Sequence, residues 1–166
     1  MPKAVSNSST LTHLSALGRL DLLQTWYEEV VIPPAVWKEV VEQGRGRAGS
    51  QEIKRAAVTG WIRIVAPTDE LLIRLLKREL GEGEAEAIVL ALQERSDILL
   101  VDESDARRVA EVYGLRKTGI VGILIRAKRE GRIMSLAQEL GRLRTEVGFW
   151  ISDALYRQAL EVVGEA

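Results

Sequence analysis

The segment ILLVDESDARRVAEVYGL, residues 98–115, decides the fold class. It opens with a run of apolar residues, which predicts a strand buried on both faces, as the strands of parallel sheets are. Two acids, Asp102 and Glu103, follow at once, and a helix is predicted over residues 104–113. An apolar strand that leads through a short polar turn into a helix is the repeating unit of a parallel α/β sheet.

The rest of the chain repeats this alternation of short apolar runs and helical patterns. The predicted strands cover residues 4–6, 30–32, 61–65 and 98–101. The predicted helices begin with the pattern Leu11, Leu14 and Leu17 and continue at residues 20–27, 33–42, 51–58, 69–80, 84–94, 104–113, 121–130, 135–147 and 152–163. This order predicts an α/β fold in which helices cover both faces of a parallel sheet of about four to five strands, a three-layer sandwich with a helical C-terminal part.

Length and composition indicate one globular domain over residues 1–166. Hydrophobic residues make up 46% of the chain and charged residues 28%, as in ordinary folded proteins. There is no Cys and a single His, His13, so disulfides, thiolate zinc sites, thiol nucleophiles and multi-histidine metal sites within one chain are excluded. No apolar run reaches about 18 residues, and no signal peptide is recognisable. We therefore expect a cytoplasmic protein that does not enter a membrane.

Polar side chains follow two of the predicted strands. Asn7 ends the first strand, and Asp102 with Glu103 ends the fourth, with Asp105 one helical turn further on. Sites in open parallel sheets form outside the carboxyl ends of the strands, so these side chains are candidates for chemistry. The alternative is that Asn7, Ser104 and Asp105 are helix caps and first-turn acids that the helix dipole stabilises.

Two further acids lie on predicted helices. In the segment GEGEAEAI, residues 81–88, Glu84 precedes Ala87 and Ile88 by one helical turn and so shares their buried face. The other acids of that segment are expected in solvent at the start of the helix. Glu39 is predicted either to point toward the carboxyl edge of the sheet or to lie on the surface, paired with a nearby Lys or Arg.

Arginines are the candidates for a local nucleic-acid contact, because the net charge of -1 gives no global basic field. Arg45 and Arg47 lie in a Gly- and Arg-rich loop at residues 43–50, and Arg107 follows Asp102 on the next helix. We predict phosphate contacts for these residues, with surface solubility as the alternative role.

The tryptophans are scattered along the chain and flanked by apolar residues. They are Trp26, Trp37, Trp61 and Trp150. We interpret them as core or interface anchors and not as a platform for stacked bases. His13 has no second His or Cys to pair with, so we expect it to be a packed or surface residue.

The order of the segments resembles the PIN-domain superfamily, and more narrowly a prokaryotic branch of predicted nucleic-acid-binding PIN-like proteins. The segments are VSNSSTLTHLSALGRLDLL, VVIPPAVWKEV, GEGEAEAIVLAL, ILLVDESDARRVAEVYGL and KTGIVGILIRAKREGRI. The resemblance covers nearly the whole chain and implies a PIN-like sandwich fold.

This resemblance implies a ribonuclease in which carboxylates gather around Mg²⁺ or Mn²⁺ and the metal activates a water for attack on RNA. Carried over residue by residue, it places Glu39, Glu84, Asp102 and the neighbouring Glu103 or Asp105 in the cluster, with Asp102 and Glu84 ranked first. Hard divalent cations prefer oxygen ligands, so a cluster without His or Cys is adequate. The resemblance also implies a possible toxin with an antitoxin partner, and a homodimer.

Asn7 departs from the family pattern, which has an Asp at the end of the first strand. An amide oxygen can ligate a cation but brings no charge to the site. Two alternatives therefore stay open: an endoribonuclease with Asn7 in its metal site, and a catalytically degenerate module that binds nucleic acid or protein. A nucleotide-binding domain is a weaker third alternative, because no G-x-G-x-x-G or Walker-type loop follows a strand.

Overall fold

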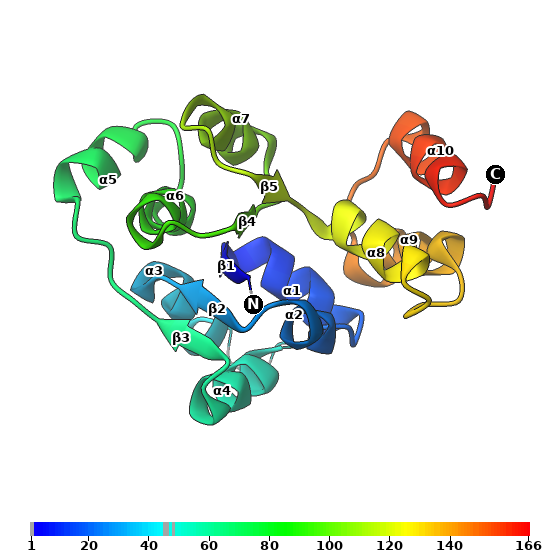
Figure 1. The fold of residues 1–166 in the computed structure, drawn as a ribbon, viewed down its shortest axis with the longest axis horizontal. Coiled ribbons are helices and arrows are strands. Elements are labelled where there is room, and N and C mark those ends of the chain that lie inside the picture. Colours follow the sequence, from blue (N-terminus) through cyan, green and yellow to red (C-terminus); the bar gives the residue numbers. More distant parts are fainter. Residues whose placement is uncertain (1, 45–46, 48) are drawn as a thin grey trace.

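The computed structural model describes residues 2–44, 47 and 49–166. Its sheet contains five parallel strands in the order β3-β2-β1-β4-β5 (Figure 1). The strands are β1 (Lys3–Ser6), β2 (Glu29–Ile32), β3 (Ile62–Ile64), β4 (Ile98–Leu100) and β5 (Lys117–Thr118). The prediction of a parallel α/β sheet of about four to five strands is confirmed.

Helices cover both faces of this sheet. They are α1 (Ser8–Ala16), α2 (Asp21–Trp26), α3 (Pro34–Trp37), α4 (Ser50–Thr59), α5 (Glu70–Leu76), α6 (Glu82–Glu94), α7 (Ser104–Val112), α8 (Ile120–Arg129), α9 (Leu136–Arg142) and α10 (Asp153–Val162). Two of them continue as π-helical segments: α3 runs into η1 (Lys38–Glu42), and α9 runs into η2 (Leu143–Val147). No helix within the described residues is both long enough and apolar enough to span a bilayer.

The two faces of the sheet bury two separate cores, because successive side chains of a strand point to opposite faces. Ala4 of β1 and Leu100 of β4 point into the larger core, which α1, α2, α4, α8 and α9 complete. Val5 of β1 and Leu99 of β4 point into the second core, which α5, α6 and α7 cover. Apolar residues on both faces explain why the strands read as continuous apolar runs.

Helix α6 packs closely against the middle of the sheet. Its inward side is made of small or branched apolar residues, and Ala85, Ala87 and Ile88 are all at most 1% exposed. The helix begins at the carboxyl edge of the sheet, so its first turn brings Glu84 to that edge.

The C-terminal helices α8, α9 and α10 extend to one side of the sheet (Figure 1). Glu165 ties the end of the chain to this part, because its carboxylate accepts hydrogen bonds from the backbone N–H groups of Leu136, at 2.6 Å, and Ala137, at 3.2 Å. Trp150, between η2 and α10, is 82% exposed. The core role is therefore wrong for Trp150, whereas Trp26 is buried as predicted.

Candidate functional site

The centre of the sheet is a topological switch point. From β1 the chain builds outward through β2 and β3, and it then returns to add β4 and β5 on the other side. Ser6 of β1 lies opposite Leu100 of β4, so both strands end at the same level. The Asn7 N–H donates to the Leu100 carbonyl at 3.1 Å and holds the two ends together. Ligands of open α/β sheets bind in the crevice that such a reversal opens.

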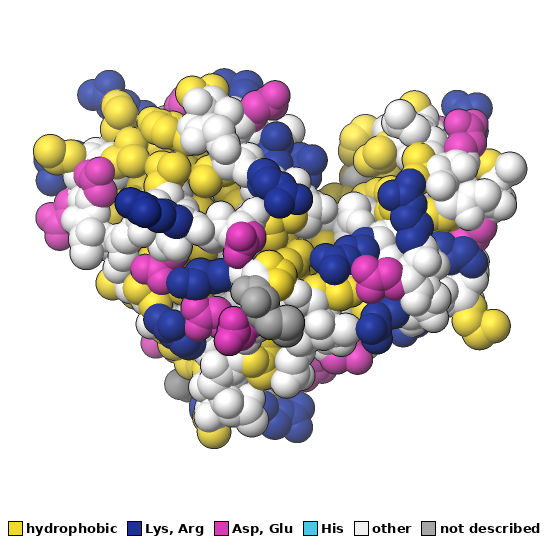
Figure 2. All heavy atoms as spheres, viewed as in Figure 1, with side chains coloured by type: hydrophobic (Ala, Val, Ile, Leu, Met, Phe, Trp, Pro, Cys, Tyr) yellow, Lys and Arg dark blue, Asp and Glu magenta, His cyan; other side chains and the backbone are white. Residues whose placement is uncertain are grey.

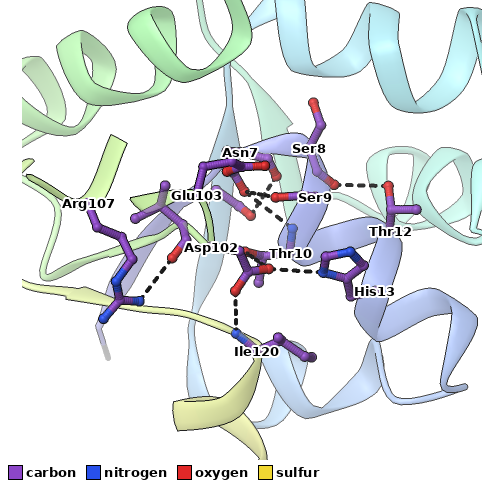
Figure 3. Close-up of polar contacts among 12 residues, drawn as sticks. Asn7, Ser8, Ser9, Thr10, Thr12, His13, Asp102, Glu103, Arg107 and Ile120 are labelled. Carbon is purple, nitrogen blue, oxygen red and sulfur yellow. Dashed lines mark hydrogen bonds and ion pairs between the residues drawn. The ribbon is translucent and has the colours of Figure 1, made fainter. Parts of the chain in front are cut away.

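Asn7 is 1% exposed and uses both ends of its amide within the protein. The oxygen Oδ1 accepts from the backbone N–H of Thr10 at 3.3 Å and caps helix α1. The nitrogen Nδ2 donates to Oε2 of Glu103 at 2.6 Å (Figure 3). The helix-cap interpretation of Asn7 is thus confirmed, and its predicted role as a metal ligand would compete with the cap.

Asp102 points away from the crevice, and its side chain is only 4% exposed. Its Oδ2 accepts from Oγ1 of Thr10 at 3.0 Å and lies 3.0 Å from Nδ1 of His13. Its Oδ1 accepts from the backbone N–H of Ile120, at the start of α8, at 2.7 Å (Figure 3). Gly119 leaves room for this carboxylate, since a Cβ there would collide with Oδ1. Asp102 therefore joins α1, β4 and α8, and these bonds leave fewer of its lone pairs for a metal ion.

The partners of Asp102 were not predicted from the sequence. Thr10 and His13 lie one helical turn apart on α1, so both can reach the same carboxylate. His13 also stacks against Phe149, with 4.7 Å between the ring centres. The spacing of three residues between Thr10 and His13 was the available signal, but α1 also carries Ser8, Ser9, Thr12 and Ser15, so this spacing does not single out the pair.

An acidic hollow opens beside Asp102 at the carboxyl edge of the sheet. It has a volume of about 450 Å³. Its lining includes Asn7, Glu39, Glu84, Glu103 and Arg47. Of the predicted cluster, the structure thus brings Glu39, Glu84 and Glu103 together with Asn7, and it turns Asp102 inward.

Glu39 reaches the hollow from the π-helical segment η1. Its Oε2 accepts from Oγ of Ser8 at 2.9 Å, and its Oε1 lies so close to Gly83 that a Cβ there would collide with it. Gly83 immediately precedes Glu84, and the two carboxylates are close enough for the charge of Glu39 to raise the pKa of Glu84. A surface ion pair was the alternative for Glu39; in the described part of the chain its partner is the Ser8 hydroxyl.

Glu84 is half-buried and has no hydrogen bond or ion pair among the described residues. Burial raises the pKa of Glu84 above its ordinary value of 4.5, and the negative charges around it raise this pKa further. Those charges belong to Glu103, Glu39 and Asp105. Among the described residues, the acids that line the hollow therefore outnumber Arg47, and Glu84 forms no ion pair in that part of the chain.

The donor set fits a hard divalent cation in chemistry, although the acids are not gathered around one point. The hollow offers carboxylate and hydroxyl oxygens, and Mg²⁺ binds through one or two carboxylates while it keeps several waters. In the described part of the chain, no group of three or more acids or histidines is close enough to hold a metal ion as it stands. The prediction that these acids together bind a metal ion stays a prediction. Glu84 and Glu103 are the residues that fit.

The remaining predicted residues lie around the edge of this site. Asp105 is exposed and forms an ion pair with Arg108 at 3.3 Å. Arg47 lies at the hollow, whereas Arg45 falls outside the residues that the structure describes. Arg107 does not face the hollow: its Nη1 donates to the Val101 carbonyl at 3.2 Å, and it lines a neighbouring groove.

Comparisons with known proteins agree with this architecture. A family model described as a PIN domain, DUF3368, matches residues 3–165. Among solved structures, the chain is similar to a PilT N-terminus domain protein from the hyperthermophilic archaeon Sulfolobus solfataricus P2. The TM-score is 0.51 and the identity 18%, and the match covers 73% of this chain and 89% of that chain. No curated protein matches. The structural likeness shows the fold.

Proposed function

Because the chain belongs to this family of PIN domains, we propose that it is a metal-dependent ribonuclease that hydrolyses RNA phosphodiester bonds at the acidic hollow. The observation that carries the proposal is Glu84, a half-buried carboxylate near the switch point of the sheet that forms no ion pair with the described residues and has other carboxylates around it. Carboxylates with a raised pKa among other acids are common in functional sites, where they act as acids or bind a cation.

The chain's own residues would bind and orient the RNA around this point. Glu84 and Glu103 would hold Mg²⁺ or Mn²⁺, which supplies a Lewis acid for the phosphate and lowers the pKa of a bound water. Arg47 at the rim of the hollow would contact a phosphate and so set the position of the backbone. The hydrogen bond from Asn7 would fix the carboxylate of Glu103 in place, and the hydrogen bond from Ser8 would fix that of Glu39.

The family resemblance is the basis for the biological setting that we propose. The ribonuclease would be the toxin of a toxin–antitoxin pair, act as a homodimer and reside in the cytoplasm. Co-purification with a small protein encoded next to this chain would test the antitoxin. Light scattering of the purified protein would test the dimer.

A catalytically degenerate module that binds nucleic acid or protein is the second candidate function. Two observations favour it. Asn7 stands where the family has an acid, and its amide is already bonded to Glu103. Asp102, the acid that the resemblance ranks first, has both oxygens occupied by protein donors.

Titration of Mn²⁺ followed by calorimetry separates the two candidates. Glu84→Gln removes the half-buried carboxylate of the hollow, and Glu82→Gln is the matched control because Glu82 is an exposed acid in the same helical turn. For a metal-dependent enzyme we expect saturable binding that Glu84→Gln abolishes and Glu82→Gln preserves, together with RNA cleavage that EDTA stops. Absence of both binding and cleavage would exclude the metal-dependent enzyme and leave the degenerate module as the candidate.

A further inference from the structure

A groove of about 940 Å³ lies next to the acidic hollow. Helix α7 and strand β5 form one wall, and the segment that leads into α10 forms the other. Figure 2 shows this groove as a notch between the body of the molecule and the C-terminal helices, with Lys and Arg side chains on one side and hydrophobic side chains on the other.

The wall before α10 exposes a large aromatic side chain. Trp150 is 82% exposed and Leu155 of α10 is 41% exposed, and both line the groove. An indole buries a large apolar area when it meets a partner, so an exposed Trp in a groove marks a contact surface. Its exposure also means that the fold does not depend on this ring.

The opposite wall carries cations. Arg107, Arg108 and Lys117 line it. Arg108 pairs with Asp105 and Glu79, and Lys117 pairs with Glu111, which also lines the groove; such pairs near the surface are weak enough to exchange for a phosphate. Arg107 has no carboxylate partner among the described residues, and its only hydrogen bond there goes to the Val101 carbonyl. Most of its donors are therefore available for an anion.

The groove and the acidic hollow share one thin partition of side chains. Asp102 lines the groove, and the next residue, Glu103, lines the hollow. His13 lines the hollow, and Phe149, which stacks against it with 4.7 Å between ring centres, lines the groove. The groove therefore lies close to the hollow, on the other side of these side chains.

We propose that this groove binds an unpaired nucleic-acid strand, with a base stacked on Trp150 and phosphates at Arg107 and the cations beside it. The inference rests on the proposed function for its choice of RNA. One aromatic wall and one cationic wall match the two repeating parts of a strand, the base and the phosphate. Only an unpaired base offers a free face to an indole, so the site discriminates against duplex. Trp150 thus becomes a stacking residue, contrary to the expectation from sequence.

The binding step can be tested without catalysis. A fluorescein-labelled oligouridine about 12 nucleotides long is titrated with the full chain in EDTA, and anisotropy gives the affinity. We expect Trp150→Ala to weaken binding about 10-fold, and Arg107→Gln to weaken it and reduce its salt dependence by about one unit of slope. Met134→Ala and Arg74→Gln are the matched controls, since each removes an exposed side chain of the same kind outside the groove. Both should bind as the wild type does.

Three results would overturn the proposal. The first is equal affinity of the wild type and Trp150→Ala, with circular dichroism showing both folded. The second is equal affinity for the oligouridine and for a duplex of the same length. The third is loss of a dimer in Trp150→Ala with unchanged RNA binding, which would make the groove a protein interface. Cleavage in Mn²⁺ is measured in parallel. RNA binding without cleavage would support the groove as a binding site and refute the nuclease function. Cleavage that Trp150→Ala does not affect would refute only the role of the groove.

Discussion

Asn7→Asp is the substitution that examines the site most directly. The Asn7 amide nitrogen donates to Oε2 of Glu103 at 2.6 Å, while the amide oxygen caps α1. An Asp keeps the cap, because its carboxylate accepts the same N–H, but it replaces the donor with a second carboxylate oxygen. The substitution thus exchanges an attraction for a repulsion at a site that is 1% exposed.

The loss of folding stability in Asn7→Asp can be estimated from the two interactions that change. A hydrogen bond to a charged group contributes about 1.5–3 kcal/mol. Two carboxylates that relax to about 4 Å repel each other by about 4 kcal/mol at an effective dielectric constant of 20, and sharing one proton relieves part of this repulsion. We therefore expect Asn7→Asp to lower the free energy of unfolding by about 2–4 kcal/mol at pH 8 in EDTA.

The pH dependence of this loss has a definite sign. The repulsion raises the pKa of the carboxyl pair in the folded state, so the folded protein binds more protons than the unfolded chain. The destabilisation must then grow as the pH rises through the raised pKa and vanish below about pH 4, where both carboxyls are protonated in either state. Urea denaturation between pH 4 and pH 8 measures it, with Asn7→Ser as the uncharged control that retains a cap.

Added Mn²⁺ should reverse the effect. The new charge faces Glu103, so we expect the variant to bind Mn²⁺ at least about 10-fold more tightly than the wild type, which corresponds to about 1.4 kcal/mol. Stability of Asn7→Asp equal to that of Asn7→Ser at pH 8 in EDTA would refute the bond between Asn7 and Glu103. Destabilisation that Mn²⁺ does not relieve would refute a cation site in the hollow.

Three other substitutions have expected outcomes in urea denaturation. Because the pKa of Glu84 is raised above 4.5 by burial and by neighbouring acids, Glu84→Gln should be more stable than the wild type at pH 7, and the difference should disappear as the pH falls below 4.5. Gly119→Ala should destabilise by about 1–3 kcal/mol, since its Cβ would collide with the Asp102 carboxylate, whereas Gly141→Ala, with nothing within 4 Å, should not. Glu165→Gln should lower the free energy of unfolding by about 1 kcal/mol, because a neutral amide caps α9 less well. Burial acts to raise the pKa of Glu165, but the hydrogen bonds from the start of α9 outweigh burial and lower this pKa. The difference between the variant and the wild type should therefore fade in acid, as Glu165 becomes protonated.

The fold was predictable from the sequence because its signals are local. Apolar runs such as residues 98–101 and helical patterns such as residues 84–94 specify elements by their period alone, and the alternation of the two specifies a parallel sheet. Strand β5 (Lys117–Thr118) has too few residues to show any period. It pairs with β4 only because the tertiary fold brings Lys117 opposite Leu99.

The places of the candidate residues in the fold were predictable, but the directions of their side chains were not. Asn7 and Asp102 were predicted at the carboxyl ends of two strands, where sites form in parallel sheets. Glu84 was predicted from the small apolar face of α6. The direction of Asp102 depends on Thr10 and on the start of α8, which lie far from it in sequence, and no local pattern encodes those bonds. The exposure of Trp150 was not predictable for the same reason: its apolar neighbours in the sequence do not cover it in the fold.

The orientation of Asp102 and Glu103 decides how the site must be tested. The chain turns between them, so Asp102 holds α1 and α8 together inside the protein while Glu103 faces the acidic hollow. Removal of Asp102 would leave the buried Thr10 hydroxyl and the N–H of α8 without acceptors, a loss of stability whatever the function. Loss of metal binding in an Asp102 variant would therefore not identify a ligand. Substitutions at Asn7 and Glu84 change the charge of the hollow and leave that buried junction intact, so they distinguish an active site from a structural one.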